Sequence, residues 1–321
     1  MVTEFHETQV LQNLKIRKRL STAMDLGLPY DSESNLVTPK TDKPNVGKSP
    51  KMDCDHFVHM GRMFLAEMLG LGLICFTIVL YQPGRKCILP VPLLVGAVFG
   101  WVAWVIGPIS GAQVNPAVSL SMLMTRRLSF VYTLVYIVAQ FVGAMAGAWL
   151  GKICGPPSIA SDDDVGMTFR NPAVSVGQAV GLEILGTCIL ITVILSTHDE
   201  FRAKRWSQGH MSAFPFMFGL TLSLLCAILS IHSGGSMNPA LSLGIAVANN
   251  NFTEQWIYVV GPLTGAIIAT LLYELILSDG AYRERIKAWF TDPHFDRTKE
   301  YRADPFIETM INTNTSLVSE L

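Results

Sequence analysis

Of the 321 residues, 50% are hydrophobic and only 15% are charged, the formal net charge is −1, and the mean hydropathy is +0.37. A soluble domain of this length rarely combines so many apolar residues with so few charged ones, and a nearly neutral chain has no basic surface for a nucleic acid. The composition therefore favours an integral membrane protein and argues against a nucleic-acid partner.

Residues 1–55 mix charged residues, Pro and Ser with little apolar periodicity, which predicts a disordered tail. Ser21 follows the basic run RKRL, and Ser129 follows RRL further along the chain. Both serines suit phosphorylation by a basophilic kinase, although basic residues beside a span also serve topology. No cleavable signal pattern begins the chain, so we expect the first span to act as its own insertion signal.

Apolar stretches near twenty residues long follow, and each can cross about 30 Å of hydrocarbon as a helix. They cover roughly residues 63–81, 90–107, 129–150, 176–197, 211–231 and 255–277. This pattern predicts an all-α membrane protein whose two chain ends lie on one side of the lipid bilayer. A channel domain over residues 56–278 would separate the N-terminal tail from a C-terminal tail over residues 279–321.

The positions of Lys and Arg indicate on which side of the bilayer the two chain ends lie, because positively charged loops are retained in the cytoplasm. Basic residues gather before the first span, before the third span at Arg126 and Arg127, and between the fourth and fifth spans. The remaining loops contain few of them, beside the acidic run Asp162–Asp164. We therefore expect both termini in the cytoplasm, with the plasma membrane as the default location.

The chain also repeats itself. Three pairs of segments match in the same order: EMLGLGLICFTIVL with EILGTCILITVIL, SGAQVNPAVSL with SGGSMNPALSL, and YIVAQFVGA with YVVGPLTGA. The repeats cover about residues 63–150 and 176–277, and each holds three spans. Because three is an odd number, the second repeat must lie upside down in the membrane relative to the first.

Each repeat contains Asn-Pro-Ala, as Asn115-Pro116-Ala117 and Asn238-Pro239-Ala240. Asn suits the position before a helix and Pro suits its first turn, while the apolar residues that follow are too few to cross the membrane. We expect two re-entrant loops, each starting a half-helix at mid-membrane around one pore. Simple capping of buried helices would explain one motif, but not two in inverted copies. A third Asn-Pro-Ala begins at Asn171, where the other repeat has no equivalent segment. We interpret it as a chance occurrence in an outer loop.

Glu67 and Glu183 occupy equivalent positions within the first and fourth spans. A carboxylate inside a span needs internal partners, and the free N–H groups of a re-entrant loop are suitable ones. Support of the two loops is the favoured interpretation. A proton relay is the alternative.

With two such boxes and ExLG in the first and fourth spans, residues 60–278 resemble the aquaporin family of major intrinsic proteins. The resemblance implies six tilted helices, two half-helices, a homotetramer with one pore per subunit, and passive conduction of water or small neutral solutes. The glycerol-conducting branch typically has Asp where this chain has Ser242, so the chain resembles the water-selective branch more closely.

The resemblance places the outer selectivity filter at Val95, Cys226, Gly235 and Leu241. Water-selective members usually have an aromatic residue, a His, a small residue and an Arg there, and many members have His at the position of Gln113. This filter is therefore atypical: it lacks the large polar and aromatic groups and the fixed positive charge.

The leading hypothesis is a passive channel for water with a filter that also admits small neutral solutes such as glycerol or urea. The alternatives are an ion-permeable channel of altered selectivity and a poorly conducting junction or signalling protein. An enzyme is not expected, because no span pairs a nucleophile with a base. No cofactor is expected either, and the cysteines show no metal-binding spacing.

Several peripheral features complete the sequence predictions. Asn251 in NNFT is predicted to be a glycosylation acceptor on an outer loop, whereas Asn314 in the cytoplasmic tail should stay bare. Cys87 and Cys154 are both expected on the outer side of the membrane. The sequence is compatible with a disulfide between them and with two free thiols. The closing Ser319-Glu320-Leu321 weakly matches a ligand of a PDZ domain. A short helix is expected near RERIKAWF.

Overall fold

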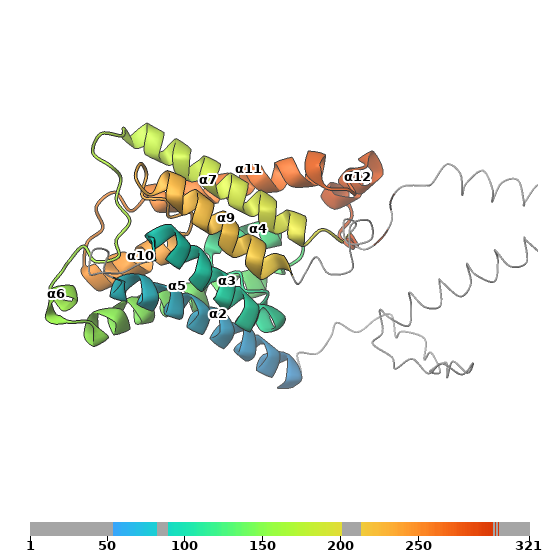
Figure 1. The fold of residues 1–321 in the computed structure, drawn as a ribbon. Coiled ribbons are helices and arrows are strands. Elements are labelled where there is room, and N and C mark those ends of the chain that lie inside the picture. The colour runs from blue at the N-terminus through green and yellow to red at the C-terminus, as the bar shows by residue number, and fades with distance from the viewer. Residues whose placement is uncertain (1–53, 82–88, 201–212, 298, 300, 302–321) are drawn as a thin grey trace, which may run out of the picture. The chain divides into compact units, whose positions relative to one another are not determined.

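The computed structural model describes residues 54–81, 89–200, 213–297, 299 and 301, which consist of helices and connecting loops (Figure 1). The helices in chain order are α2 (Cys54–Leu80), α3 (Val91–Ser110), α4 (Pro116–Met124), α5 (Phe130–Cys154), α6 (Pro157–Ala160), α7 (Val176–Thr197), α9 (Phe214–Leu229), α10 (Pro239–Asn249), α11 (Ile257–Leu272), the π-helical η2 (Tyr273–Leu277) and α12 (Arg283–Thr291).

Five helices are long and apolar enough to cross a membrane within the described residues: α2, α3, α5, α7, and α11 continued by η2. The remaining expected span, 211–231, forms the 16-residue helix α9, and residues 201–212 before it lie outside the described part. Pro215 stands in the first turn of α9, where a missing backbone N–H is tolerated. The all-helical membrane architecture expected from the sequence is confirmed.

Local sequence explains where several helices begin and end. Ser175 starts α7 with a capping box, in which its side chain accepts from the backbone of Gln178 and the Gln178 side chain accepts from the backbone of Ser175. Ser129 caps α5 in the simpler way, by accepting from the backbone N–H of Tyr132. Gly111 ends α3 in a left-handed conformation, φ 80°, which a residue without a Cβ adopts readily.

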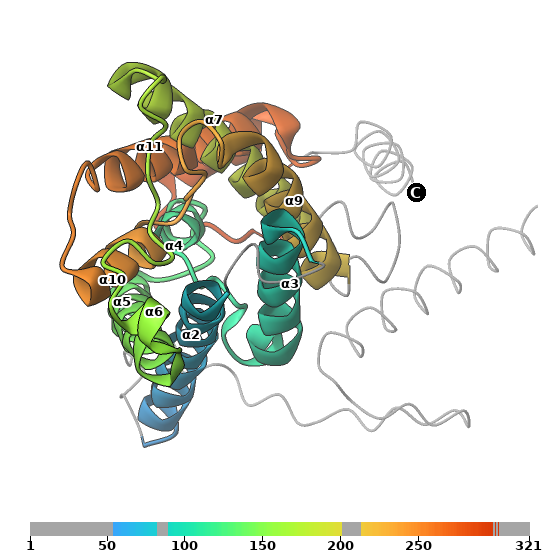
Figure 2. The same ribbon diagram turned by 60° about the vertical axis from the view of Figure 1, so that its left-hand side comes forward.

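The long helices pack in pairs that follow the repeat. Helix α2 packs against α5 and α7 against α11, while α3 and α9 join the two repeats (Figure 2). Glycines allow the closest approaches: a Cβ on Gly147 of α5 would lie 1.9 Å from the carbonyl oxygen of Gly72 of α2. Likewise, a Cβ on Gly219 of α9 would lie 2.5 Å from the carbonyl oxygen of Gly96 of α3. Larger residues at these positions would push the helices apart.

Two short helices lie inside this arrangement. Helix α4 has nine residues and α10 has eleven, so they extend only about 14 and 17 Å. Each begins directly after the Asn of its Asn-Pro-Ala box. The third box behaves differently: Asn171 is exposed and the residues after it form a turn, with the Ala173 N–H bonded to the Asn171 side chain at 3.0 Å.

The first part of the C-terminal tail packs against the channel body over residues 283–297, and it contains α12 where a short helix was expected near RERIKAWF. Trp289 of α12 donates its indole N–H to the carbonyl of Met124 at 3.1 Å, and Arg297 donates to the carbonyl of Thr125 at 2.7 Å. These bonds satisfy carbonyls at the end of α4 that have no partner within that helix. A hydropathy pattern could not reveal this packing, because the contacts are hydrogen bonds from single side chains, Trp289 and Arg297, to backbone carbonyls.

Candidate functional site

The loop before α4 is held by a buried carboxylate of α2. Glu67 is 0% exposed and accepts four hydrogen bonds. Its Oε1 accepts from the Ser110 hydroxyl at 2.6 Å and the Gln113 backbone N–H at 2.9 Å. Its Oε2 accepts from the Val114 backbone N–H at 2.7 Å and the Gln140 side chain at 2.8 Å. The carboxylate thus binds two loop N–H groups, of Gln113 and Val114, that belong to no helix.

The loop before α10 is held in the equivalent way by Glu183 of α7, which is also 0% exposed. Its Oε1 accepts from the Ser233 hydroxyl at 2.8 Å and the Ser236 backbone N–H at 3.1 Å. Its Oε2 accepts from the Met237 backbone N–H at 2.8 Å. Contacts of this kind fit the interpretation of both carboxylates as loop supports rather than as a proton relay.

Two tyrosines extend the match between the repeats. Tyr136 of α5 donates its hydroxyl to the carbonyl of Ser110 at 2.7 Å, and Tyr258 of α11 donates to the carbonyl of Ser233 at 2.8 Å. The residues just before the two boxes also share an unusual backbone, since Val114 has φ 41° and Met237 has φ 53°. A left-handed conformation is costly for these side chains, and the carboxylate contacts hold it in place.

Each box asparagine caps its half-helix. The Asn115 side-chain oxygen accepts from the Ala117 backbone N–H at 2.9 Å. The Asn238 side-chain oxygen accepts from the Leu241 backbone N–H at 3.2 Å. Such caps satisfy N–H groups that the first turn of a helix leaves free, at the end where the helix dipole is positive.

The two loops also bind each other through these asparagines. The Asn115 amide donates to the carbonyl of Met237, and the Asn238 amide donates to the carbonyl of Val114, both at 2.8 Å. A side-chain amide has two donor hydrogens. One hydrogen of each amide therefore joins the loops, and the other has no acceptor among the described residues.

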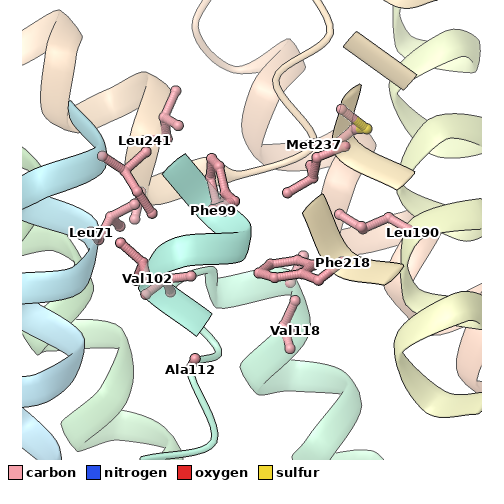
Figure 3. Close-up of a cluster of buried hydrophobic side chains, with 14 of the residues drawn as sticks. Leu71, Phe99, Val102, Ala112, Val118, Leu190, Phe218, Met237 and Leu241 are labelled. Carbon is pink, nitrogen blue, oxygen red and sulfur yellow. The ribbon is translucent and has the colours of Figure 1, made fainter. Parts of the chain in front are cut away.

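A cavity of about 370 Å³ reaches this junction and is lined by both asparagines. All four expected filter residues line it: Val95, Cys226, Gly235 and Leu241. Phe99 and Phe218 also line it, and their rings meet edge to face at 5.6 Å between centres within the apolar cluster of Figure 3. The chain thus brings the filter positions and the boxes to one space, although the side chains come from α3, α9, α10 and the loop before α10.

Sequence reasoning missed other residues of this cavity wall. Met167, Thr168 and Phe169 line it from the loop between α6 and α7, and Tyr81 lines it from the end of α2. The loop between the repeats has no counterpart within either repeat, so the internal comparison could not reveal it. Gln113 is buried, and its side-chain oxygen has no hydrogen-bond partner among the described residues.

A second polar cluster lies at the end of the bundle where α12 packs. Glu274, in η2, is 1% exposed and bonds three guanidinium groups: Arg297 at 2.9 Å, Arg285 at 3.0 Å and Arg127 at 3.5 Å. Glu200 binds Arg127 at 3.1 Å and Arg297 at 3.2 Å. We call these five residues the arginine cluster. It ties the loop after α4, the end of α7, η2 and the C-terminal segment together.

The charges of this cluster act on Glu200. Burial by itself opposes the charged form of the carboxyl, but the neighbouring Arg127 and Arg297 outweigh burial and lower the pKa of Glu200 below its usual value. No local sequence pattern indicates the cluster, because Glu200 is 73 residues from Arg127 and 97 residues from Arg297 along the chain.

The loop after α10 and the loop between α6 and α7 contain two further described contacts. Asn251 is partly exposed and donates its side-chain amide to Asp164 at 2.8 Å. Arg170 forms a paired contact with Glu254, with the shorter bond at 2.7 Å. Ser129 is exposed at the start of α5. Ser21, Cys87, Asn314 and the Ser319–Leu321 terminus lie outside the described residues.

Comparison with known proteins identifies a matching family model and several similar proteins. The family model described as Major intrinsic protein matches residues 56–273. Aquaporin-1 of Ovis aries is 36% identical over 201 residues, which are 62% of this chain and 72% of the relative. Lens fiber major intrinsic protein is 35% identical in Ovis aries and 34% in Homo sapiens, over 61% of this chain and 72% of each relative.

A solved structure shows the same fold. The X-ray structure of the aquaglyceroporin from Plasmodium falciparum aligns with a TM-score of 0.58, at 22% sequence identity. The alignment covers 68% of this chain and 97% of that chain.

Proposed function

This chain belongs to the major intrinsic protein family, which makes it a multi-pass membrane channel rather than an enzyme, and we propose that it conducts both water and small neutral solutes such as glycerol or urea. The proposed path passes the outer filter and then the two Asn-Pro-Ala boxes. Conduction is passive, along the gradient of the solute.

The cavity that joins the four filter residues to Asn115 and Asn238 is the main support for this proposal. Its filter side chains are compact, and none of the four is charged or aromatic. A solute with a carbon skeleton can slide past Val95 and Leu241 while its polar groups reach the box amides. Pore width and the polar groups of the wall decide selectivity in such channels, so we expect a permissive filter.

The box region should still oppose cations. The N-termini of α4 and α10 carry positive dipole ends, and the free amide hydrogens of Asn115 and Asn238 point the same sign of charge at a permeant. Without a fixed charge at Leu241 this barrier is weaker than in a filter with Arg. Ion conduction is therefore the second candidate function, and the observation that favours it is Leu241 at the position where water-selective members usually have Arg.

The distribution of charge and the apolar surface support a proposed orientation and assembly. The concentration of Lys and Arg in alternate loops supports cytoplasmic termini, and we take the plasma membrane as the location. Large apolar side chains are exposed on the helix faces, among them Trp104 (66%), Phe216 (69%) and Ile276 (68%). Lipid and neighbouring subunits of a homotetramer would cover such faces.

Osmotic swelling of vesicles that contain the purified full-length protein tests the proposal. Vesicles with protein should shrink or swell faster than empty vesicles, and an inward gradient of glycerol or urea should cause reswelling. Protein-free rates for water and for every solute would reject the channel and favour a junction or signalling role. Currents under voltage clamp would instead favour ion permeation.

A further inference from the structure

Three hydroxyl groups form a row beside the second box. Thr168 Oγ1 lies 2.9 Å from Ser242 Oγ, and Ser242 Oγ in turn bonds Ser236 Oγ. Ser236 Oγ lies 3.1 Å from the carbonyl oxygen of Asn238. Ser242 is 1% exposed, Thr168 7% and Ser236 8%, and Thr168 and Ser236 are among the residues that line the cavity. The row thus begins at the cavity wall, passes behind it, and ends at the box.

The row can be polarised in either direction, because a hydroxyl has one hydrogen to donate and can accept two. If Ser236 donates to the Asn238 carbonyl, then Ser242 donates to Ser236, Thr168 donates to Ser242, and Thr168 offers the cavity a lone pair. If Ser236 donates to Ser242, then Ser242 donates to Thr168, and Thr168 has its hydrogen free. Thr168 can therefore act as an acceptor or as a donor, whereas an Arg could only donate.

Thr168 is held firmly for a loop residue. The Gln255 side chain, 2% exposed, donates to the Thr168 backbone carbonyl at 3.2 Å. Gly234 faces the Thr168 methyl group so closely that a Cβ there would lie 2.5 Å from it. The adjacent pair of Arg170 and Glu254 fastens the same loop to the segment after α10. The hydroxyl therefore has a fixed place relative to Leu241, which lines the same cavity.

We propose that Thr168 is a specificity-determining residue of this channel, with its hydroxyl supplying the hydrogen bond that the outer filter lacks. This inference rests on the proposed conduction of water and small solutes. It assigns the role to a loop outside both repeats, oriented by Ser242, and it predicts a preference for solutes whose hydroxyl groups both donate and accept.

Removal of the hydroxyl at nearly constant volume is the direct test. Thr168→Val should lower glycerol flux into protein-containing vesicles about threefold to tenfold, the range expected for one lost hydrogen bond. Thr168→Ser, which keeps the hydroxyl, should restore at least half of the flux. Thr187→Val is the matched control, because Thr187 is fully buried in α7 and does not line the cavity. Its flux should equal that of the wild type.

A double substitution separates recognition from a merely structural role. Leu241→Arg returns a strong donor beside Thr168, so Thr168→Val should change water flux less in that background than in the wild type. Equal effects in both backgrounds, or wild-type flux in Thr168→Val, would overturn the inference while leaving the channel intact. If Thr168→Val does not fold, Ser242→Ala must reduce glycerol flux for the inference to stand. A wild type that passes neither water nor glycerol would overturn the channel proposal itself.

Discussion

Asn115 and Asn238 fasten each other's loops: each side-chain amide donates, at 2.8 Å, to the backbone carbonyl of the residue before the other asparagine. The contact is reciprocal because the two boxes belong to inverted repeats. It joins the N-termini of two half-helices that enter from opposite sides, with 122 and 124 residues of sequence separation between the bonded residues.

The junction predicts a strong effect of Asn238→Ala. The substitution removes the cap of α10 and leaves the buried Val114 carbonyl without its partner, which should cost about 1–3 kcal/mol of stability and abolish most water flux. Asn171→Ala is the matched control, because this asparagine stands in the same three-residue motif but is exposed. Thermal unfolding in detergent and vesicle swelling measure the two effects. Equal results for both variants would contradict the role of the junction.

Leu241 should set the upper size limit of the filter. Leu241→Arg fills the cavity wall and adds a fixed charge, so glycerol and urea flux should fall about tenfold or more, as expected from an unfavourable contact of at least 1.4 kcal/mol, while water flux persists. Reswelling in solute gradients measures the change. If the wild type already excludes every solute larger than water, the permissive filter is refuted.

Cys226 lines the cavity, whereas Cys75 is fully buried in α2. A small mercurial should therefore slow wild-type permeation by reacting with Cys226, and a reducing thiol should reverse the effect. Cys226→Ser should abolish inhibition and Cys75→Ser should leave it unchanged. Undiminished inhibition of Cys226→Ser would mean that another thiol controls permeation.

Asn251 is predicted to be glycosylated in cells that add N-linked glycans. Its side chain is partly exposed in the loop after α10, although its amide contacts Asp164 in the folded protein. We expect the nascent chain to be glycosylated before that contact forms. A glycosidase should shift the wild-type band on a gel but not the Asn251→Gln band. A shift that depends on Asn314 instead would reverse the proposed orientation.

Acid should weaken the arginine cluster through Glu200. Because the pKa of Glu200 in the folded protein is lowered below the usual 4.5, its stabilising charge is fully present above that pH and is lost as the pH falls further. Wild type should unfold at a higher temperature than Glu200→Gln at pH 7, and the difference should shrink below about pH 4.5. A difference that is constant with pH would show that the Glu200 charge does not stabilise the fold.

Part of the site and of the fold could be predicted from the sequence. Glu67, Glu183 and the two box asparagines could be found from the sequence alone, because each lies in a local pattern that occurs twice. Apolar length likewise predicts the spans, since the bilayer sets that length whatever the neighbouring helices are. Both signals are local, and the tertiary structure only adds the distances.

The contacts of Thr168 and Arg297 could not be predicted in this way, because they join segments that are not equivalent in the two repeats. Thr168 meets Ser242 across 74 residues, and Arg297 meets Thr125 across 172. Their partners lie on other elements, so composition and periodicity around Thr168 or Arg297 contain no trace of them. The inverted repeat and the membrane spans were therefore determined by the sequence itself. The hydroxyl row beside the filter and the docked C-terminal segment were decided only when the chain packed.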